Sequence, residues 1–411
     1  MKFLILISFL LPAGLSSQAH LLKVGPSQKY KSIQAAVLGS FNGDTILVEN
    51  GLYKEKNITV NKAVTLIGIQ FPVLDGEHQF EILSLKSNHI TIQGFKIIHS
   101  GISSLEDIAG IKIYECRDVI VTNNILEDDF FGIYVQAGTQ CRIENNEIKA
   151  FSKIEPQSGN GIHCWKCDSL LIRKNRISGH RDGIYFEFVT NSKIELNTSA
   201  NNLRYGLHFM FSHHDDYVSN IFRNNGAGVS VMFTHGVKML NNRFEDNWGD
   251  GSYGLLLKEI SDSYISGNKF TNNTAGIYME GASRIQIEAN LFQGNGWAMK
   301  IQASCMDVHV SGNNFLSNTF DIATNGVLVL NSFNHNYWDK YEGYDLNKDN
   351  VGDVPFHPVS LFSMIVEKNP SAMMLFRSFM TTLLDKTEKI IPSLTPENLK
   401  DDYPFMKPIQ L

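Results

Sequence analysis

Residues 175–210 read NRISGHRDGIYFEFVTNSKIELNTSANNLRYGLHFM, and this stretch contains one pattern twice. In each half an Asn precedes a short alternating segment, and a glycine followed by an apolar residue opens another, at Gly183-Ile184 and Gly206-Leu207. Apolar residues fall at the first and third places after the glycine, which is the period of a strand with one buried face. The stretch therefore predicts short strands separated by turns rich in Asn and Gly.

The same pattern extends in both directions along the chain. The Gly-apolar pair recurs eight times between Gly110 and Gly276, at intervals of 22 to 29 residues. An Asn before an apolar residue recurs between Asn124 and Asn314, and its intervals lengthen at the same places. The longer intervals are therefore insertions into a single repeat. A repeat of three short strands predicts an all-β fold, a right-handed single-stranded parallel β-helix of about eleven coils.

Composition agrees with a stacked, turn-rich fold. The 411 residues include 37 Asn and 32 Gly, and Asn side chains stacked inside the turns can hydrogen-bond along the rod. Lys and Arg number 36 against 42 Asp and Glu, for a net charge of −6. This balance argues against nucleic acid as a partner, because no basic stripe is present to face phosphates. A hydrophobic content of 43% excludes a disordered chain.

The N-terminal segments predict export and a capped rod. Lys2 and the apolar run from Phe3 to Leu15 resemble a secretory signal peptide over residues 1–19, cleaved after Ala19. The run is too short to span a bilayer. The mature protein is therefore expected in the periplasm, attached to a membrane only through a partner. Residues 20–63 are predicted to form an N-terminal cap, which contains a short helix at Ser32-Ile-Gln-Ala-Ala-Val-Leu.

The rest of the chain divides into three segments. The β-helix is assigned to residues 64–340, with fainter repeats reaching back to about residue 45. Residues 341–358 form an acidic loop, and residues 359–411 form a tail of helical composition. A helical tail cannot extend the β-helix, so it either folds back on the rod or docks on a partner. Insertions near residues 99–109, 150–160 and 246–252 are candidates for a binding face.

One outward face of the predicted strands carries candidate metal ligands. Residues at the second and fourth places after the glycine point outward, and neighbouring coils lie about 4.8 Å apart. His208, Met210 and Met232 are therefore expected close together, because they share these places in adjacent coils. Two thioethers and an imidazole favour Cu(I), held loosely and passed on. The alternative is a polar outer face whose methionines lie under an insertion or a partner.

Further polar residues surround this candidate copper site. His163 and Glu187 lie one or two coils away on the same face, and His163 is counted among the copper ligands. His213, His214 and His235 follow in the adjacent turns and could serve as auxiliary entry ligands. Adjacent histidines in an exposed turn are otherwise simply solvated.

Two other motifs suggest metal or redox chemistry. The acidic loop places Asp345, Asn347, Asp349 and Asp353 at alternating positions, as in a calcium-binding loop. Its sixth position is Asn350 rather than Gly and no Glu stands at the twelfth, so a solvated acidic turn is the alternative. Cys164-Trp-Lys-Cys167 has the spacing of a redox pair, but the register turns Cys164 toward the core.

A β-helix also hosts lyases, hydrolases and epimerases of acidic polysaccharides. Such enzymes need paired carboxylates or a basic cluster in an open groove. Asp182, Glu187 and Glu280 are the candidates, and no two of them pair on adjacent coils. A carbohydrate-active enzyme is therefore the second hypothesis, and a structural adaptor without metal is the third. No phosphate-binding G-x-x-x-x-G-K-[ST] run is present in the chain.

Several segments together resemble one family, the NosD accessory proteins of nitrous oxide reductase maturation. The resemblance covers most of the mature chain, although the Cys-Trp-Lys-Cys segment stands where the family has apolar and small residues. It is carried by Gly159-Asn-Gly-Ile-His163, Arg181-Asp-Gly-Ile-Tyr185, Arg204-Tyr-Gly-Leu-His-Phe-Met210, Asn336-Tyr-Trp-Asp339 with the acidic loop, and Asp402-Tyr-Pro-Phe-Met-Lys-Pro408.

The resemblance implies a non-enzymatic subunit outside the cytoplasmic membrane. Such proteins work with an ABC transporter made of a permease and an ATPase. A copper chaperone lipoprotein supplies Cu(I), and the complex docks the apo nitrous oxide reductase. His163, His208, Met210 and Met232 match positions where the family also has His or Met. The tail would hold the β-helix on the permease, through the candidate residues Met373, Phe376, Met380, Leu383, Pro404 and Met406.

Overall fold

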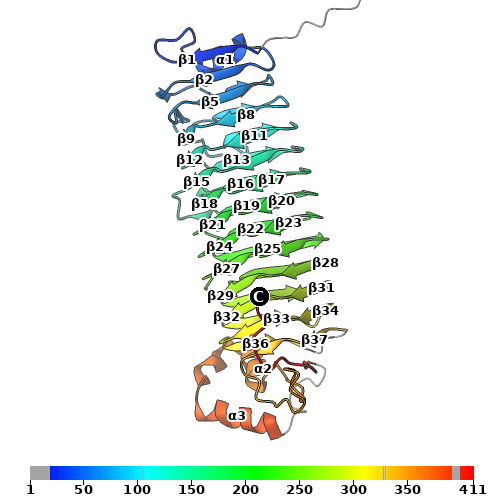
Figure 1. The fold of residues 1–411 in the computed structure, drawn as a ribbon. Helices are drawn as coiled ribbons and strands as arrows, with labels where there is room; N and C mark the ends of the chain where they lie inside the picture. The colour runs from blue at the N-terminus through cyan, green and yellow to red at the C-terminus, as the bar shows by residue number, and fades with distance from the viewer. Residues whose placement is uncertain (1–18, 104, 327, 329, 391–398) are drawn as a thin grey trace, which may run out of the picture.

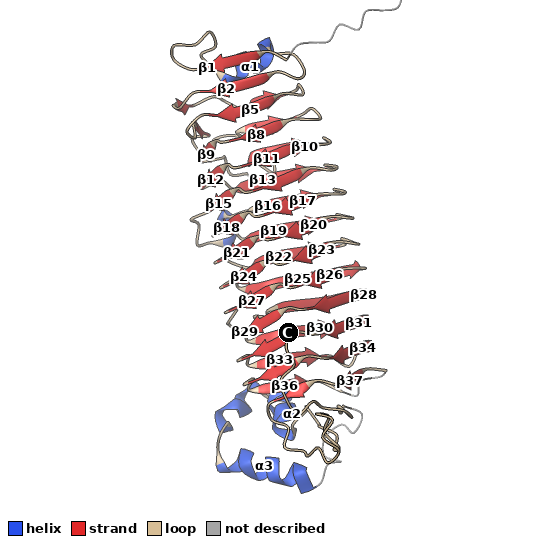
Figure 2. Ribbon diagram, viewed as in Figure 1, coloured by secondary structure: helices blue, strands red, loops and turns tan. Residues whose placement is uncertain are grey.

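The computed structural model describes residues 19–103, 105–326, 328, 330–390 and 399–411. The predicted signal peptide lies outside these residues except for Ala19. The chain winds into a rod of stacked parallel strands, with helices at its two ends and in one small insertion (Figures 1 and 2). The strands form three columns. Two columns share a 25-stranded sheet, and the third is a 13-stranded sheet. The predicted parallel β-helix is confirmed.

The first column carries the residues at the second and fourth places after the repeat glycines. Its strands are β4 (Ile58–Val60), β7 (Leu83–Leu85), β10 (Ala109–Tyr114), β13 (Phe131–Gln136), β16 (Ile162–Trp165), β19 (Asp182–Glu187), β22 (Tyr205–Met210), β25 (Ala227–His235), β28 (Leu255–Ser266), β30 (Ala275–Glu280), β33 (Trp297–Ile301) and β36 (Phe320–Ala323).

The second column shares β28 with the first. Its other strands are β1 (Leu21–Val24), β2 (Thr45–Val48), β5 (Thr65–Gly68), β8 (Thr91–Gln93), β11 (Ile120–Thr122), β14 (Arg142–Glu144), β17 (Leu171–Arg173), β20 (Lys193–Glu195), β23 (Asp216–Val218), β26 (Lys238–Leu240), β31 (Ser283–Glu288), β34 (Met306–Ser311) and β37 (Ser332–Asn334).

The third column forms the separate sheet. Its strands are β3 (Leu52–Tyr53), β6 (Val73–Asp75), β9 (Lys96–Ile98), β12 (Ile125–Glu127), β15 (Glu147–Lys149), β18 (Arg176–Ser178), β21 (Thr198–Ala200), β24 (Ile221–Arg223), β27 (Arg243–Glu245), β29 (Lys269–Thr271), β32 (Leu291–Gln293), β35 (Asn314–Leu316) and β38 (Tyr337–Trp338).

The number of coils was predicted too low. The second column stacks about fourteen strands rather than eleven, because β1 and β2 already pair before residue 64. The predicted cap segment 20–63 therefore contributes strands of the first coils as well as helix α1 (Ile33–Gly39). The hydroxyl of Ser32 accepts a hydrogen bond from the backbone N–H of Ala35 and caps this helix, whose Ile33, Ala36 and Val37 are buried.

Alternation along each strand places the core inside the rod. In β19 the side chains of Ile184 and Phe186 are fully buried, and Tyr185 and Glu187 between them face outward. The repeat glycines are required by close packing. A Cβ on Gly206 would lie 2.7 Å from the carbonyl oxygen of Gly228 and 2.8 Å from the side-chain nitrogen of Asn225.

A ladder of buried asparagines explains the Asn content. Each side-chain amide donates to the side-chain oxygen of the next Asn along the rod, for example Asn197 to Asn220 at 3.0 Å. At its C-terminal end the ladder differs from the Asn series predicted from the sequence, because it continues through Asn313 rather than Asn314. Its members are Asn124, Asn146, Asn175, Asn197, Asn220, Asn242, Asn268, Asn290, Asn313 and Asn336.

The C-terminal residues close the last coil of the rod. The carboxylate of Asp401 is fully buried and accepts hydrogen bonds from the side chains of Asn336 and Trp338, both at 3.0 Å. It thus ends the Asn ladder. The chain then returns along the side of the rod (Figure 1), and the backbone of Ile409 exchanges two hydrogen bonds with the side chain of Asn314.

Three helical segments lie at the C-terminal end of the rod: α2 (Leu361–Lys368), η2 (Pro370–Leu375) and α3 (Phe379–Ile390) (Figure 2). Phe362 and Val366 of α2 are buried against Phe320 of the rod, and Lys300 forms an ion pair with Glu367 at 2.7 Å. The predicted helical tail thus folds back on the rod. A further short helix, η1 (Glu155–Gln157), lies in one insertion.

Among the described residues, no helix has the length and apolar character needed to cross a membrane.

Candidate metal-binding face

The outer surface of the first column brings most of the predicted copper ligands together. The strands β19, β22 and β25 pair in parallel and in register, so that Glu187 lies opposite Met210 and Met210 opposite Met232. All three side chains are half-buried. The two thioethers therefore occupy neighbouring coils on one face, about 4.8 Å apart along the rod.

Tyr185 links the carboxylate to the first thioether. Its hydroxyl lies 3.5 Å from Oε2 of Glu187 and 3.6 Å from Sδ of Met210. Burial, with the nearby charge of Glu187, raises the pKa of Tyr185 to about 12. The hydroxyl therefore keeps its proton at physiological pH and acts as a donor toward this face.

His208 stands two residues before Met210 in β22. Its ring lies against those of Tyr185 and Tyr205, with centroids 5.0 and 4.8 Å away. The side chain is 6% exposed, and within the described chain neither ring nitrogen has a hydrogen-bond partner. Nδ1 is 3.7 Å from Oδ2 of Asp182, beyond hydrogen-bond range. The hydroxyl of Ser230, opposite His208 in the ladder, is also buried without a described partner. An unpaired buried imidazole beside two thioethers is a donor set that suits Cu(I).

His163 lies apart from the other predicted ligands. It is stacked between Tyr134 and Tyr185, with ring centroids 4.4 and 4.7 Å away. Tyr185 therefore separates it from His208. Its Nδ1 is hydrogen-bonded to the side chain of Asn160 at 2.9 Å. Burial and the positive charge of Arg181 lower the pKa of His163 to about 3, so the ring is neutral at physiological pH.

The three auxiliary histidines form a group: His213 and His214 lie in the turn after β22, and His235 is the last residue of β25. His213 stacks on His235 with centroids 3.9 Å apart, and His214 meets His235 edge-on at 4.9 Å. Burial and the two neighbouring imidazoles lower the pKa of His213. His235 stands three residues after Met232, and His213 stands three residues after Met210 in the preceding coil.

Sequence reasoning missed an aromatic strip beside the methionines. Phe188, Phe211 and Phe233 stack in consecutive coils with centroids 5.3 and 5.1 Å apart, although each is more than a third exposed. A signal was present, because each stands at the fifth place after a repeat glycine. A contiguous exposed apolar strip is typical of a surface that a partner covers.

The carboxylates predicted for polysaccharide chemistry do not form a pair. Arg204 holds Asp182 by two hydrogen bonds, of 2.9 and 2.6 Å. Burial alone would raise the pKa of Asp182, but the hydrogen bonds and the positive charge of Arg204 hold it below the ordinary value. Glu187 and Glu280 are four ladder steps apart, about 19 Å. Glycosidase carboxylates lie about 5 to 9.5 Å apart, so this geometry does not favour hydrolysis.

The carboxylates of the acidic loop accept hydrogen bonds from the loop's own backbone. The carboxylate of Asp345 accepts hydrogen bonds from the N–H groups of Lys348, Asp349 and Asn350, and Asp353 accepts one from Leu346. In the described chain these carboxylates do not form a group of three whose ligand atoms lie within 4.8 Å of one another. The arrangement matches a series of Asx turns, the alternative that the sequence left open.

The five cysteines lie in the interior of the rod. All five are buried and unpaired, and burial raises the pKa of Cys164 well above its ordinary value. Cys167 donates to the carbonyl of Trp165 at 3.3 Å. Both thiols are buried, and the raised pKa of Cys164 is the opposite of what a reactive cysteine needs.

The predicted docking residues fall into two groups. Met373, Phe376, Met380 and Leu383 are between 37% and 51% exposed on η2 and α3 and in the segment between them. Pro404 and Met406 instead belong to the closure of the rod. Their backbones bond to Gly352 and Asn350 of the acidic loop, at 2.8 and 2.9 Å. The exposed apolar surface is completed by Met374, Leu375 and Phe379.

Residues 149–343 match the family model described as periplasmic copper-binding protein (NosD). A probable ABC transporter binding protein NosD from Pseudomonas aeruginosa is 27% identical over 81% of this chain and 82% of its own length. Its counterpart from Stutzerimonas stutzeri is 25% identical over 82% and 80%.

Among solved structures, the catalytic unit of a GH87 α-1,3-glucanase from Streptomyces thermodiastaticus superposes with a TM-score of 0.52. It shares 13% identity over 74% of this chain and 65% of the glucanase. At that identity the likeness concerns the fold alone.

Proposed function

Because the chain belongs to the NosD family, we propose that it is a periplasmic accessory protein for copper-centre assembly in nitrous oxide reductase. In this role it accepts Cu(I) transiently from a copper chaperone lipoprotein and presents it to the apo reductase. An ABC transporter permease and its ATPase anchor the rod and supply the energy. The chain itself catalyses no reaction.

The observation that carries this proposal is the thioether pair beside an unpartnered imidazole. Met210 and Met232 are neighbours in the ladder, and His208 has no described hydrogen-bond partner for either nitrogen. Soft donors bind Cu(I) without needing charge compensation from the protein. The face is half-buried but open along the rod, which suits a site that releases its ion.

The surrounding groups have supporting roles in this proposal. Glu187 lies opposite Met210 in the ladder and gives the ion's surroundings a negative charge, while the hydroxyl of Tyr185 orients toward both side chains as a hydrogen-bond donor. His213, His214 and His235 provide weaker nitrogen donors at the side where an ion would enter. His163 is set apart by Tyr185 and serves as part of the aromatic stack.

A Cu(I) titration of the mature chain tests the site. Under anaerobic conditions, with a competing chromophoric chelator, we expect one tightly bound equivalent. Met210→Ala/Met232→Ala should weaken this binding at least a hundredfold, and His208→Ala at least tenfold. Met306→Ala is the matched control, because Met306 is 49% exposed on β34, away from this face.

Equal affinities for the parent chain and the double variant would disprove the copper site. The rod would then act only as an adaptor between the transporter and the reductase. Circular dichroism of each variant verifies that the β-helix is intact.

A further inference from the structure

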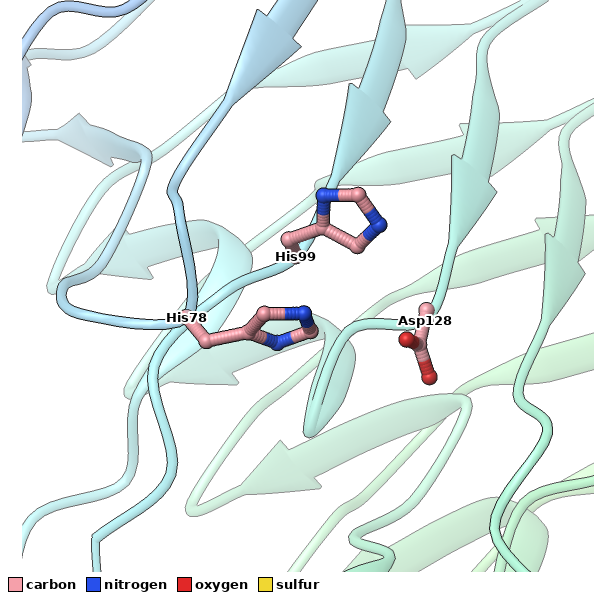
Figure 3. A group of neighbouring side chains, drawn as sticks. All are labelled: His78, His99 and Asp128. Atoms are coloured by element: carbon pink, nitrogen blue, oxygen red, sulfur yellow. The ribbon is translucent and has the colours of Figure 1, made fainter.

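A second group of metal-ligating side chains lies in the N-terminal third of the rod. The turns after β6, β9 and β12 bring together His78, His99 and Asp128 (Figure 3). Their ligand atoms all lie within 4.8 Å of one another, and no other such trio of His, Cys, Asp or Glu occurs in the described chain. Both imidazole rings extend toward the carboxylate.

Three consecutive coils hold these side chains in place. The register pairs Asp75 with Ile98 and aligns Ile98 with Glu127, so the residues that follow occupy adjacent turns. The N–H of His78 donates to the carbonyl of His99 at 2.8 Å. All three ligands have left-handed backbones, with φ between 57° and 60°. The spacing of the ligands is therefore fixed by the backbone, before any ion binds.

A carboxylate orients one of the two imidazoles. Nδ1 of His99 lies 3.0 Å from Oδ1 of Asp75, which also accepts the N–H of Glu77 at 3.0 Å. This contact leaves Nε2 of His99 directed away from Asp75. A carboxylate bonded to the far nitrogen of an imidazole is the usual support of a metal-binding histidine. The rings of His78 and His99 lie 4.5 Å apart at 36°.

We propose that His78, His99 and Asp128 bind one divalent transition-metal ion, through two imidazole nitrogens and a carboxylate oxygen. This donor set is harder than the thioethers of the copper face and suits Zn²⁺ or Cu²⁺ rather than Cu(I). His78 is exposed, and the other two residues are half-buried.

The site keeps one position open for a ligand from solution. Three protein donors leave the fourth position of a tetrahedral ion free, as in sites that exchange ligands. A groove of about 370 Å³ begins at His78 and Asp128 and continues along Phe130, Phe151 and Ile154. The insertion at residues 150–160 forms one wall of this groove. The sequence marked this insertion as a candidate for a binding face, and the proposed site lies beside it.

Zn²⁺ titration of the metal-free mature chain, with a competing chromophoric chelator, tests this proposal. We expect one equivalent, weakened at least a hundredfold by His78→Ala/His99→Ala and at least tenfold by Asp128→Asn. Asp75→Asn should weaken binding about tenfold while leaving all three ligands in place. His89→Ala is the control, because His89 is an exposed turn histidine beside Asp118 and outside the trio. X-ray absorption at the zinc edge should show only nitrogen and oxygen neighbours.

Unchanged Zn²⁺ affinity in the double histidine variant, or no bound equivalent in the parent chain, would overturn the proposal. Sulfur neighbours at the zinc edge would also overturn it, because the three proposed ligands contain no sulfur. The Met210→Ala/Met232→Ala variant should retain the zinc site. The two sites therefore succeed or fail independently.

Discussion

At the scale of single residues, Asp215 is held in an environment that opposes its charge. The side chain is fully buried, and one oxygen accepts the N–H of Ser192 at 2.7 Å. The other oxygen has no hydrogen-bond partner among the described residues. Burial raises the pKa of Asp215 to about 8, so the folded protein carries a neutral carboxyl here at physiological pH.

Asp215→Asn should therefore stabilise the protein at high pH. Below about pH 4 the carboxyl is protonated in both the folded and the unfolded chain, so its ionisation does not affect the free energy of unfolding. Between pH 4 and 8 the unfolded chain ionises and the folded chain does not, so stability falls as the pH rises through this window. The amide removes this loss, and the free energy of unfolding at pH 8 should rise on the order of a few kcal/mol. Urea unfolding at pH 4 and pH 8 measures the difference.

Asp250→Asn serves as the matched control, because Asp250 is exposed in the insertion at residues 246–252 and is not among the charges that act on Asp215. Its pH profile should follow that of the parent chain. A parallel shift of Asp215→Asn at both pH values would contradict the assignment, since it would indicate a change in packing rather than in ionisation.

Some of the candidate sites could be predicted from single residues and some could not. The adjacency of Met210 and Met232 follows from the strand register alone, because parallel in-register coils align equal places in the repeat. The isolation of His163 depends on how the ring of Tyr185 packs, which a register does not specify. His78 and His99 escaped notice because they lie in turns with left-handed backbones, outside the strand pattern.

At the scale of elements, the Asn ladder is the feature that defines the coils. Each member supplies a donor and an acceptor to its neighbours. Removal of one side chain therefore leaves several buried groups without a hydrogen-bond partner. Asn220 accepts from the backbone N–H and the side chain of Asn197, and donates to Asn242 and to the carbonyl of Ile194. A buried group left unpaired costs about 1–3 kcal/mol.

Asn220→Ala should lower the free energy of unfolding by about 3 kcal/mol or more. Asn224→Gly is the control, because Asn224 is an exposed turn residue and glycine keeps its left-handed backbone (φ 52°). Chemical denaturation of both variants makes the comparison. Equal unfolding midpoints would show that the ladder only accompanies the fold and does not stabilise it.

The ladder also explains which coils could be recognised from sequence. The first ladder residue is Asn124. The preceding coil has no Asn at the ladder position, and there the backbone N–H of Phe95 donates to the side chain of Asn124. The coils that precede residue 124 therefore lack the strongest marker of the repeat, and the predicted number of coils was too low. The C-terminal closure was missed for a different reason, because Asp401 contacts residues more than sixty positions away.

At the scale of the whole molecule, the C-terminal end of the rod exposes an apolar surface. Helices η2 and α3 at the C-terminal end expose Met374 to 90% and Phe379 to 83%. Helix α2 beneath them is fixed to the rod by Phe362 and Val366. The arrangement presents a firmly anchored apolar surface, in keeping with the proposed docking on a permease.

Met374→Asp/Phe379→Asp should abolish capture of the permease without changing thermal stability, because neither side chain contributes to the core. Co-purification of a tagged chain with its transporter measures the effect. Leu105→Asp is the control, since Leu105 is 94% exposed toward the other end of the rod. Undiminished capture by the double variant would place the docking surface elsewhere, for instance on the strip of Phe188, Phe211 and Phe233.

The closure by Asp401 has a consequence for the order in which the protein folds. Coils can wind one upon another as the chain emerges from its N-terminus, each using the previous coil as a template. The final coil, with Asn336 and Trp338, receives its hydrogen-bond acceptor only when the last eleven residues arrive. Until that moment the growing rod ends in an open strand edge, which is the part of a nascent β-protein most prone to pair with a wrong neighbour. The tail therefore covers the edge in the folded protein, and its time of arrival determines how long the edge can pair with a wrong neighbour during folding.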